Sequence, residues 1–82
     1  MIKVLLIDDD AFILNAYQRM LRNTPYDCSY LQQPEQLWQV PELARFDVVL
    51  ADQQMPGLTG SELLRQLQQQ YPLIKRVLVS GD

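Results

Sequence analysis

The sequence predicts an α/β fold in which parallel strands alternate with helices. Short runs rich in Val, Ile and Leu stand at residues 2–7, 46–51 and 74–79. Such runs are typical of strands that are buried on both faces, as parallel strands are. Amphipathic segments with helical spacing separate these runs, and that order implies βαβ units with right-handed crossovers.

The first strand, residues 2–7, leads directly into a helix. Asp10 can cap this helix by accepting hydrogen bonds from its free amides. The Asn-Thr-Pro stretch at 23–25 ends it. Residues 26–31 then form a more polar strand, which we expect at an edge of the sheet. Apolar residues repeat on one face of the helix: Ile13, Leu14, Tyr17, Met20 and Leu21.

The middle of the chain predicts short helical turns followed by a buried strand. Pro34 suits the first turn of a helix, and residues 35–40 give one or two turns. Pro41 either interrupts this segment or starts a second short one through Leu43. The strand at 46–51 follows.

A loop and a longer helix precede the last strand. Residues 52–59 form the loop, with turn chemistry in the Met-Pro-Gly stretch at 55–57. Thr59 or Gly60 can cap the helix, and Glu62 has the spacing of a capping box with Thr59. One face of the helix is apolar: Leu63, Leu64, Leu67 and Tyr71.

The composition limits the classes of function. The chain has 82 residues, a net charge of −3 and no basic stripe, so we expect one small domain that does not bind nucleic acid directly. Its longest apolar stretch is too short to span a membrane. A single cysteine, Cys28, excludes an internal disulfide, and no His is present to activate it as a nucleophile. We therefore expect a cytoplasmic protein without a membrane partner.

Oxygen-bearing side chains follow three of the predicted strands. Asp8, Asp9 and Asp10 follow the first strand, Asp52 follows the third and Ser80 follows the last. The carboxyl ends of parallel strands meet at one edge of a sheet, where ligands bind in such folds. Carboxylates brought together there repel one another unless a cation lies between them. Oxygen ligands without His favour Mg²⁺, with Mn²⁺ or Ca²⁺ as substitutes.

The motifs resemble the receiver domain of two-component response regulators. Asp52 opens an Asp-x-x-Met-Pro-Gly-x-x-Gly stretch, and it lies 44 and 43 residues after Asp8 and Asp9. The resemblance covers all 82 residues and implies a flavodoxin-like (βα) fold with a parallel sheet. Three segments carry it: Leu5 to Asp10, Val48 to Gly60, and Val77 to Gly81.

The resemblance also implies a role for each matching residue. Asp52 would be the phosphorylation site, accepting phosphate from a histidine kinase or phosphotransfer protein. Asp8, Asp9, Asp52 and the backbone carbonyl of Gln54 would bind Mg²⁺, and Ser80 would bind the phosphoryl group as the switch residue. The domain would then drive an output domain or effector, as a signalling switch and not as an enzyme acting on a separate substrate. The residues that shape the loop would be Met55, Pro56 and Gly57.

One departure concerns the C-terminal part of the fold. The resemblance implies that residues 1–82 are the N-terminal portion of a receiver, truncated after the fourth strand, without the fifth strand and the last two helices. The family's essential lysine then has no counterpart, because Lys75 and Arg76 lie at the amino end of the fourth strand, far from the predicted site. We expect impaired phosphorylation of this segment, and homo-oligomers formed through the exposed strand edge.

Two other functions compete with the signalling switch. A pseudo-receiver would keep the fold as an interaction module without phosphorylation. A haloacid-dehalogenase-like hydrolase would use Asp8 and Asp10 in its strand-end motif, although Phe12 stands where that family has Thr or Val. The hydrolase hypothesis does not explain the stretch from Asp52 to Gly57.

Overall fold

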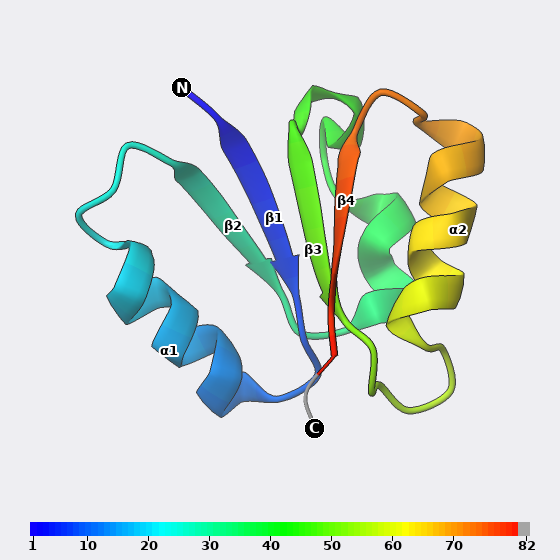
Figure 1. The fold of residues 1–82 in the computed structure, drawn as a ribbon, viewed down its shortest axis with the longest axis horizontal. Coiled ribbons are helices and arrows are strands. Elements are labelled where there is room, and N and C mark those ends of the chain that lie inside the picture. Colours follow the sequence, from blue (N-terminus) through cyan, green and yellow to red (C-terminus); the bar gives the residue numbers. More distant parts are fainter. Residues whose placement is uncertain (81–82) are drawn as a thin grey trace.

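A computed structural model describes residues 1–80 and contains four strands, two α-helices and two 3₁₀ helices (Figure 1). The predicted alternation of strands and helices is confirmed. The elements in chain order are β1 (Lys3–Ile7), α1 (Ala11–Leu21), β2 (Asp27–Leu31), η1 (Pro34–Gln39), η2 (Leu43–Arg45), β3 (Val48–Asp52), α2 (Gly60–Gln70) and β4 (Lys75–Val79).

The four strands form one parallel sheet in the order β2-β1-β3-β4. This arrangement confirms the predicted α/β flavodoxin-like class, and it also confirms the edge position of the polar strand β2. All four strands run in the same direction, so their carboxyl ends lie together at the lower side of Figure 1. The register places Ile7 beside Ala51, and the residues that follow β1 therefore lie next to the end of β3.

The main core lies on the sheet face that α2 and η1 cover. Alternate residues of β1 and β3 point to this face, and Leu5, Ile7 and Val49 are almost completely buried there. Burial of each such side chain contributes about 1.5–3 kcal/mol. The side chains that meet them from the helical layer are Leu37, Leu63, Leu64 and Leu67.

Helix α1 covers the other face less completely than its sequence pattern predicts. It starts as expected, because the Asp10 carboxylate accepts a hydrogen bond of 2.9 Å from the Phe12 amide. Of its predicted apolar face, Leu14 is buried, whereas Ile13 is 40% and Met20 is 70% exposed. A cavity of about 230 Å³ lies between α1 and the sheet, and Val4, Leu6, Tyr17, Met20, Leu21, Tyr26, Cys28 and Leu50 line it.

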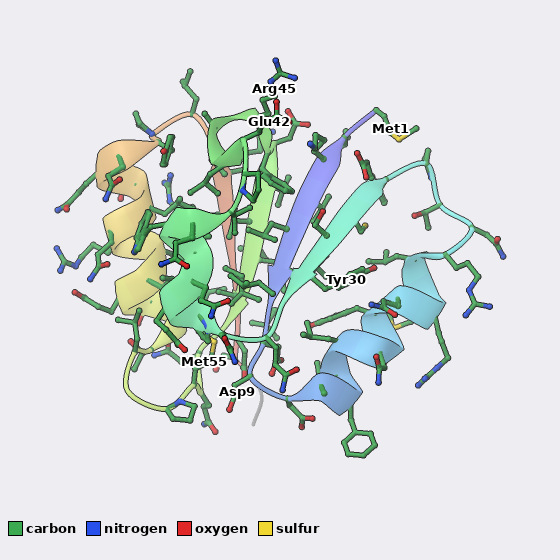
Figure 2. All side chains as sticks on the ribbon, turned by 180° about the vertical axis from the view of Figure 1, so that it is seen from behind. Met1, Asp9, Tyr30, Glu42, Arg45 and Met55 are labelled. Carbon is green, nitrogen blue, oxygen red and sulfur yellow. The ribbon has the colours of Figure 1, made fainter. Side chains whose placement is uncertain are left out.

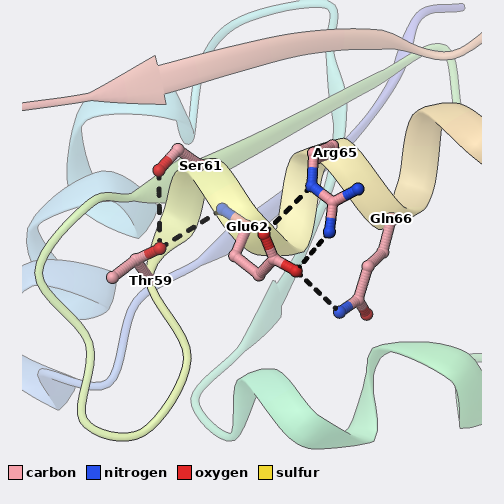
Figure 3. Close-up of polar contacts among 5 residues, drawn as sticks. All are labelled: Thr59, Ser61, Glu62, Arg65 and Gln66. Atoms are coloured by element: carbon pink, nitrogen blue, oxygen red, sulfur yellow. Dashed lines mark hydrogen bonds and ion pairs between the residues drawn. The ribbon is translucent and has the colours of Figure 1, made fainter.

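Helix α2 begins at the predicted cap, but only half of the capping box forms (Figure 3). Thr59 Oγ1 accepts a hydrogen bond of 3.2 Å from the Glu62 amide. The Glu62 carboxylate points along the helix, where it accepts hydrogen bonds from Arg65 and, at 3.5 Å, from Gln66. The Arg65 hydrogen bond lowers the pKa of Glu62. The guanidinium thus competes successfully with the Thr59 amide for this carboxylate.

Two strand boundaries differ from the expectation in ways that affect the site. β3 ends on Asp52 itself, because the Asp52–Val79 pair still belongs to the β3–β4 register. β4 begins at Lys75, one residue after the predicted start at residue 74, so Lys75 and Arg76 are its first two residues. Backbone pairing causes the second difference: the Lys75 amide donates to the Asp47 carbonyl at 2.9 Å, which fixes Lys75 in the sheet.

Within residues 1–80, no helix has both the length and the apolar character needed to span a membrane.

Candidate functional site

Three carboxylates meet at the carboxyl end of the sheet. Asp8 and Asp9 follow β1, and Asp52 ends β3 beside them. One oxygen from each of these side chains lies within 4.8 Å of the others. Figure 2 shows Asp9 at this edge, with Glu42 and Arg45 at the opposite edge. The predicted convergence of oxygen ligands from two strands is therefore present.

The carboxylates open into a cavity of about 420 Å³ at the carboxyl edge. The cavity is also lined by Asp10, by Gln54 in the loop after β3 and by Val79 at the end of β4. Helix α1 contributes Ile13 and Tyr17. None of the lining residues carries a positive charge. The cavity is therefore an acidic pocket, defined by the residues Asp8, Asp9, Asp10, Ile13, Tyr17, Asp52, Gln54 and Val79.

Asp8 is the most buried of the three carboxylates, with 5% of its surface exposed. Burial raises the pKa of Asp8, and the negative charges of Asp52 and Asp9 raise it further. A hydrogen bond of 2.9 Å from the Asp10 amide opposes this rise by stabilising the ionised form. The same hydrogen bond fixes the direction of the carboxylate. The Asp10 amide thus holds the Asp8 carboxylate in place, while the charges of Asp9 and Asp52 disfavour its ionised form.

This donor set suits a hard divalent cation. Carboxylate oxygens are the preferred ligands of Mg²⁺, Mn²⁺ and Ca²⁺ in proteins, and the residues that line the pocket supply no softer donor. A cation between Asp8, Asp9 and Asp52 would offset the mutual repulsion that adds to the effect of burial on the pKa of Asp8. The residues present therefore fit such an ion.

The loop after β3 is held close to the pocket by backbone and side-chain hydrogen bonds. The Gln53 amide donates to the Val79 carbonyl at 2.9 Å, and the Gln53 side chain accepts from the Ser61 amide at 2.8 Å. Gln54 is exposed and lines the pocket. Of the three residues predicted to shape the loop, Met55 is buried in the core, Pro56 is exposed, and Gly57 has a φ of +80°. A positive φ favours glycine, so the turn needs Gly57.

Ser80 lies directly after β4 and is exposed. It is not among the residues that line the acidic pocket, whereas the preceding residue, Val79, is. Gly81, which the sequence pattern also included, lies outside the described residues. The switch role of Ser80 stays a prediction.

Two features of the site were not assigned from the sequence. The sequence assigned Tyr17 only to the apolar face of the first helix, but it also lines the pocket, where burial and the charges of Asp8 and Asp52 raise its pKa. Its position on the same helical face as Ile13 was the available signal. Gly60 packs against the backbone of Asp52, and a Cβ at this position would overlap the Asp52 carbonyl. The sequence motif includes Gly60, but the motif alone did not predict that Gly60 packs against Asp52.

Several curated proteins resemble this chain. The C4-dicarboxylate transport transcriptional regulatory protein DctD of Pseudomonas aeruginosa is 35% identical over 79 residues, which are 96% of this chain and 17% of that protein. The DNA-binding transcriptional regulator NtrC of Escherichia coli K12 is 27% identical over 78 residues, 95% of this chain and 17% of that protein. The chain spans less than a fifth of the length of each of these relatives.

Solved structures share the fold, and a family model identifies it. The signal receiver domain of an HD domain-containing protein from Pseudomonas fluorescens Pf-5 has a TM-score of 0.89 and 31% identity, over 99% of this chain and 65% of that one. A response regulator receiver domain protein from Clostridium thermocellum has a TM-score of 0.89 and 26% identity, over 99% and 66%. The model of the response regulator receiver domain matches residues 4–82. The chain therefore belongs to the response regulator receiver domain family.

Proposed function

We propose that this chain receives a phosphoryl group on Asp52 from a histidine kinase or phosphotransfer protein and passes the signal to an output domain or effector. The observation that carries the proposal is the approach of Asp8, Asp9 and Asp52, whose carboxylate oxygens lie within 4.8 Å of one another. Membership of the receiver family supports it, as do relatives named as regulatory proteins.

Mg²⁺, or Mn²⁺ or Ca²⁺ in its place, would be held by Asp8, Asp9, Asp52 and the backbone carbonyl of Gln54. When bound, such an ion supplies positive charge that offsets the charges of the carboxylates and of a phosphoryl group. Burial is the main cause of the raised pKa of Asp8, and the charges of Asp52 and Asp9 add to the rise; a cation would offset that second contribution. The position of Gln54 on the pocket supports its place in the ligand set.

The protein's own residues would position the acceptor. Asp52 is held at the end of β3 by pairing with Val79, and its side chain opens into the acidic pocket. The Gln53 hydrogen bonds and the turn at Gly57 fix the loop behind it. Ser80 follows Val79, which lines the pocket. Its hydroxyl would donate a hydrogen bond to the phosphoryl group and draw the end of β4 inward.

We also propose that phosphorylation of this chain alone is slow. No basic side chain lines the acidic pocket, and Lys75 and Arg76 lie at the opposite end of β4. A basic side chain at the pocket, in addition to the metal ion, would stabilise the charge of the transferred group. Since the chain spans 65% of the solved receiver domain from Pseudomonas fluorescens, we treat residues 1–82 as the N-terminal portion of a receiver. In the cytoplasm it would act as a switch and not as a turnover enzyme.

Beryllofluoride, a phosphoryl mimic, tests the proposal together with Mg²⁺. Calorimetry and ¹⁹F NMR on the whole chain should show Mg²⁺ binding, and beryllofluoride binding that requires both Mg²⁺ and Asp52. Asp47→Asn is the matched control, because Asp47 lies at the other edge of the sheet, where it accepts a hydrogen bond from the Lys3 amide. Absence of Mg²⁺ binding would favour the pseudo-receiver. Beryllofluoride binding that survives Asp52→Asn but is lost in Asp8→Asn would favour the hydrolase.

A further inference from the structure

Gln53, the first residue after β3, is bonded to two neighbouring elements. Its backbone amide donates to the Val79 carbonyl of β4 at 2.9 Å. Its carbonyl accepts a hydrogen bond of 3.2 Å from the Gly60 amide, and its side-chain Oε1 accepts one of 2.8 Å from the Ser61 amide. A single residue therefore joins the end of β3 both to β4 and to the start of α2.

Only the side-chain hydrogen bond depends on the identity of this residue, because the two backbone bonds need no particular side chain. The first amides of a helix have no partner within the helix. In α2, Thr59 accepts from the Glu62 amide (Figure 3), and Gln53 accepts from the Ser61 amide across eight positions of the chain. Gln53 thus acts as a second cap of α2 and closes the loop that lies between β3 and this helix.

This arrangement leaves Gln54 between two fixed residues. On one side Gln53 is held by its three hydrogen bonds. On the other side Met55 is 6% exposed and packs in the main core. Each residue has only two soft backbone dihedrals, so one residue between two anchors has little backbone freedom. The Gln54 side chain is exposed and lines the acidic pocket, but its backbone is held in place.

We propose that Gln53 is a positioning residue for the cation site: its side-chain bond to α2 holds the loop so that the Gln54 carbonyl is in place before the ion binds. Ordering a loop during binding lowers affinity, and a loop that is already ordered avoids this cost. Gln53 itself does not line the pocket, so it acts through its neighbour. This inference rests on the proposed function, which assigns the Gln54 carbonyl to the ion.

Calorimetric Mg²⁺ titration of the whole chain compares the parent with Gln53→Ala, and urea unfolding verifies that both are folded. Mg²⁺ affinity should fall roughly threefold to tenfold, the range by which the loss of one exposed hydrogen bond shifts an equilibrium. Gln69→Ala is the matched control, because Gln69 is exposed near the other end of α2. Equal affinity of the parent and Gln53→Ala would overturn this inference alone. A parent that binds no Mg²⁺ would overturn the proposed function as well.

Two further substitutions separate the hydrogen bond from the bulk of the side chain. Gln53→Glu keeps an acceptor oxygen at the same length and should restore parent-like Mg²⁺ affinity in about 0.5 M KCl, where the added charge is screened. Gln53→Leu has similar size without an acceptor and should bind Mg²⁺ as weakly as Gln53→Ala. Parent-like affinity of Gln53→Leu in the same salt would overturn the role of the hydrogen bond.

Amide hydrogen exchange measured by NMR gives a readout that does not depend on phosphorylation. Without metal, the Ser61 amide should exchange faster in Gln53→Ala than in the parent. The Tyr71 amide, bonded to Leu67 at the far end of α2, should be unchanged. Coupling between two equilibria is reciprocal, so Mg²⁺ should slow exchange of the Ser61 amide more in the parent than in Gln53→Ala. An Mg²⁺-bound parent in which this exchange is as fast as in the metal-free parent would overturn the coupling.

Discussion

Substitution of Gly60 by alanine tests how the start of α2 positions Asp52. A Cβ at Gly60 would overlap the Asp52 carbonyl oxygen, lie 2.8 Å from its carbonyl carbon and lie 2.9 Å from Cδ1 of Leu78. The leucine can rotate, but the Asp52 backbone is fixed in β3 between β1 and β4. The helix and the end of β3 must therefore move apart.

The expected cost follows from the size of this overlap. Overpacking of this kind lowers the free energy of unfolding by about 1–3 kcal/mol. The better helix propensity of alanine offsets at most about 1 kcal/mol of this loss. We expect Gly60→Ala to lower the free energy of unfolding by about 1–2 kcal/mol. Since Asp52 is displaced, Mg²⁺ affinity should also fall by about tenfold or more, as for other residues that orient metal ligands.

Urea unfolding and calorimetric Mg²⁺ titration measure the two effects separately. Gly57→Ala is the matched control, because nothing lies within 4 Å of a Cβ there and its φ of +80° is the main source of strain. It should cost about 1–2 kcal/mol of stability and leave Mg²⁺ affinity nearly unchanged. A Gly60→Ala protein with the stability and Mg²⁺ affinity of the parent would refute this account of Gly60.

Three further predictions concern the pocket and the helix ends. The pKa of Asp8 is raised above 3.8 in the folded protein, so the stability that its proton contributes is full below pH ~3.8 and is lost as pH rises through the raised pKa. Asp8→Asn should therefore remove this pH dependence and stabilise the metal-free protein at pH 7 by about 1 kcal/mol, as urea unfolding from pH 3 to 7 would show. Asp10→Ala should lose about 1 kcal/mol through the α1 cap, whereas Asp10→Ser should retain most of it in the same assay. Arg65→Ala should leave the urea midpoint within error of the parent, because its ion pair with Glu62 is exposed, and a clear shift would contradict this.

Most of the fold could be predicted because its signals are local. Asp10 and Thr59 cap the helices that the sequence assigned to them, since capping depends on residues only two or three positions apart. The polar strand β2 was expected at an edge, where its backbone and side chains can meet water. The convergence of Asp8, Asp9 and Asp52 was also predictable, because parallel strands bring their carboxyl ends to one edge.

Tertiary contacts decided the features that the sequence pattern missed. The apolar spacing of α1 predicted a buried face, yet Ile13 and Met20 are largely exposed, because periodicity gives the direction of a face and not what covers it. Asp52 was expected to begin the loop after the third strand, but its pairing with Val79 makes it the last residue of β3.

The sequence by itself thus determined the order of the elements, the helix caps and the set of carboxylates. Only the tertiary structure decided which side chains share the pocket, Tyr17 included, and how closely Gly60 approaches Asp52. The physical reason is that caps and periodicity depend on neighbours along the chain, whereas burial, charge repulsion and steric contact depend on residues that meet only after the sheet has formed.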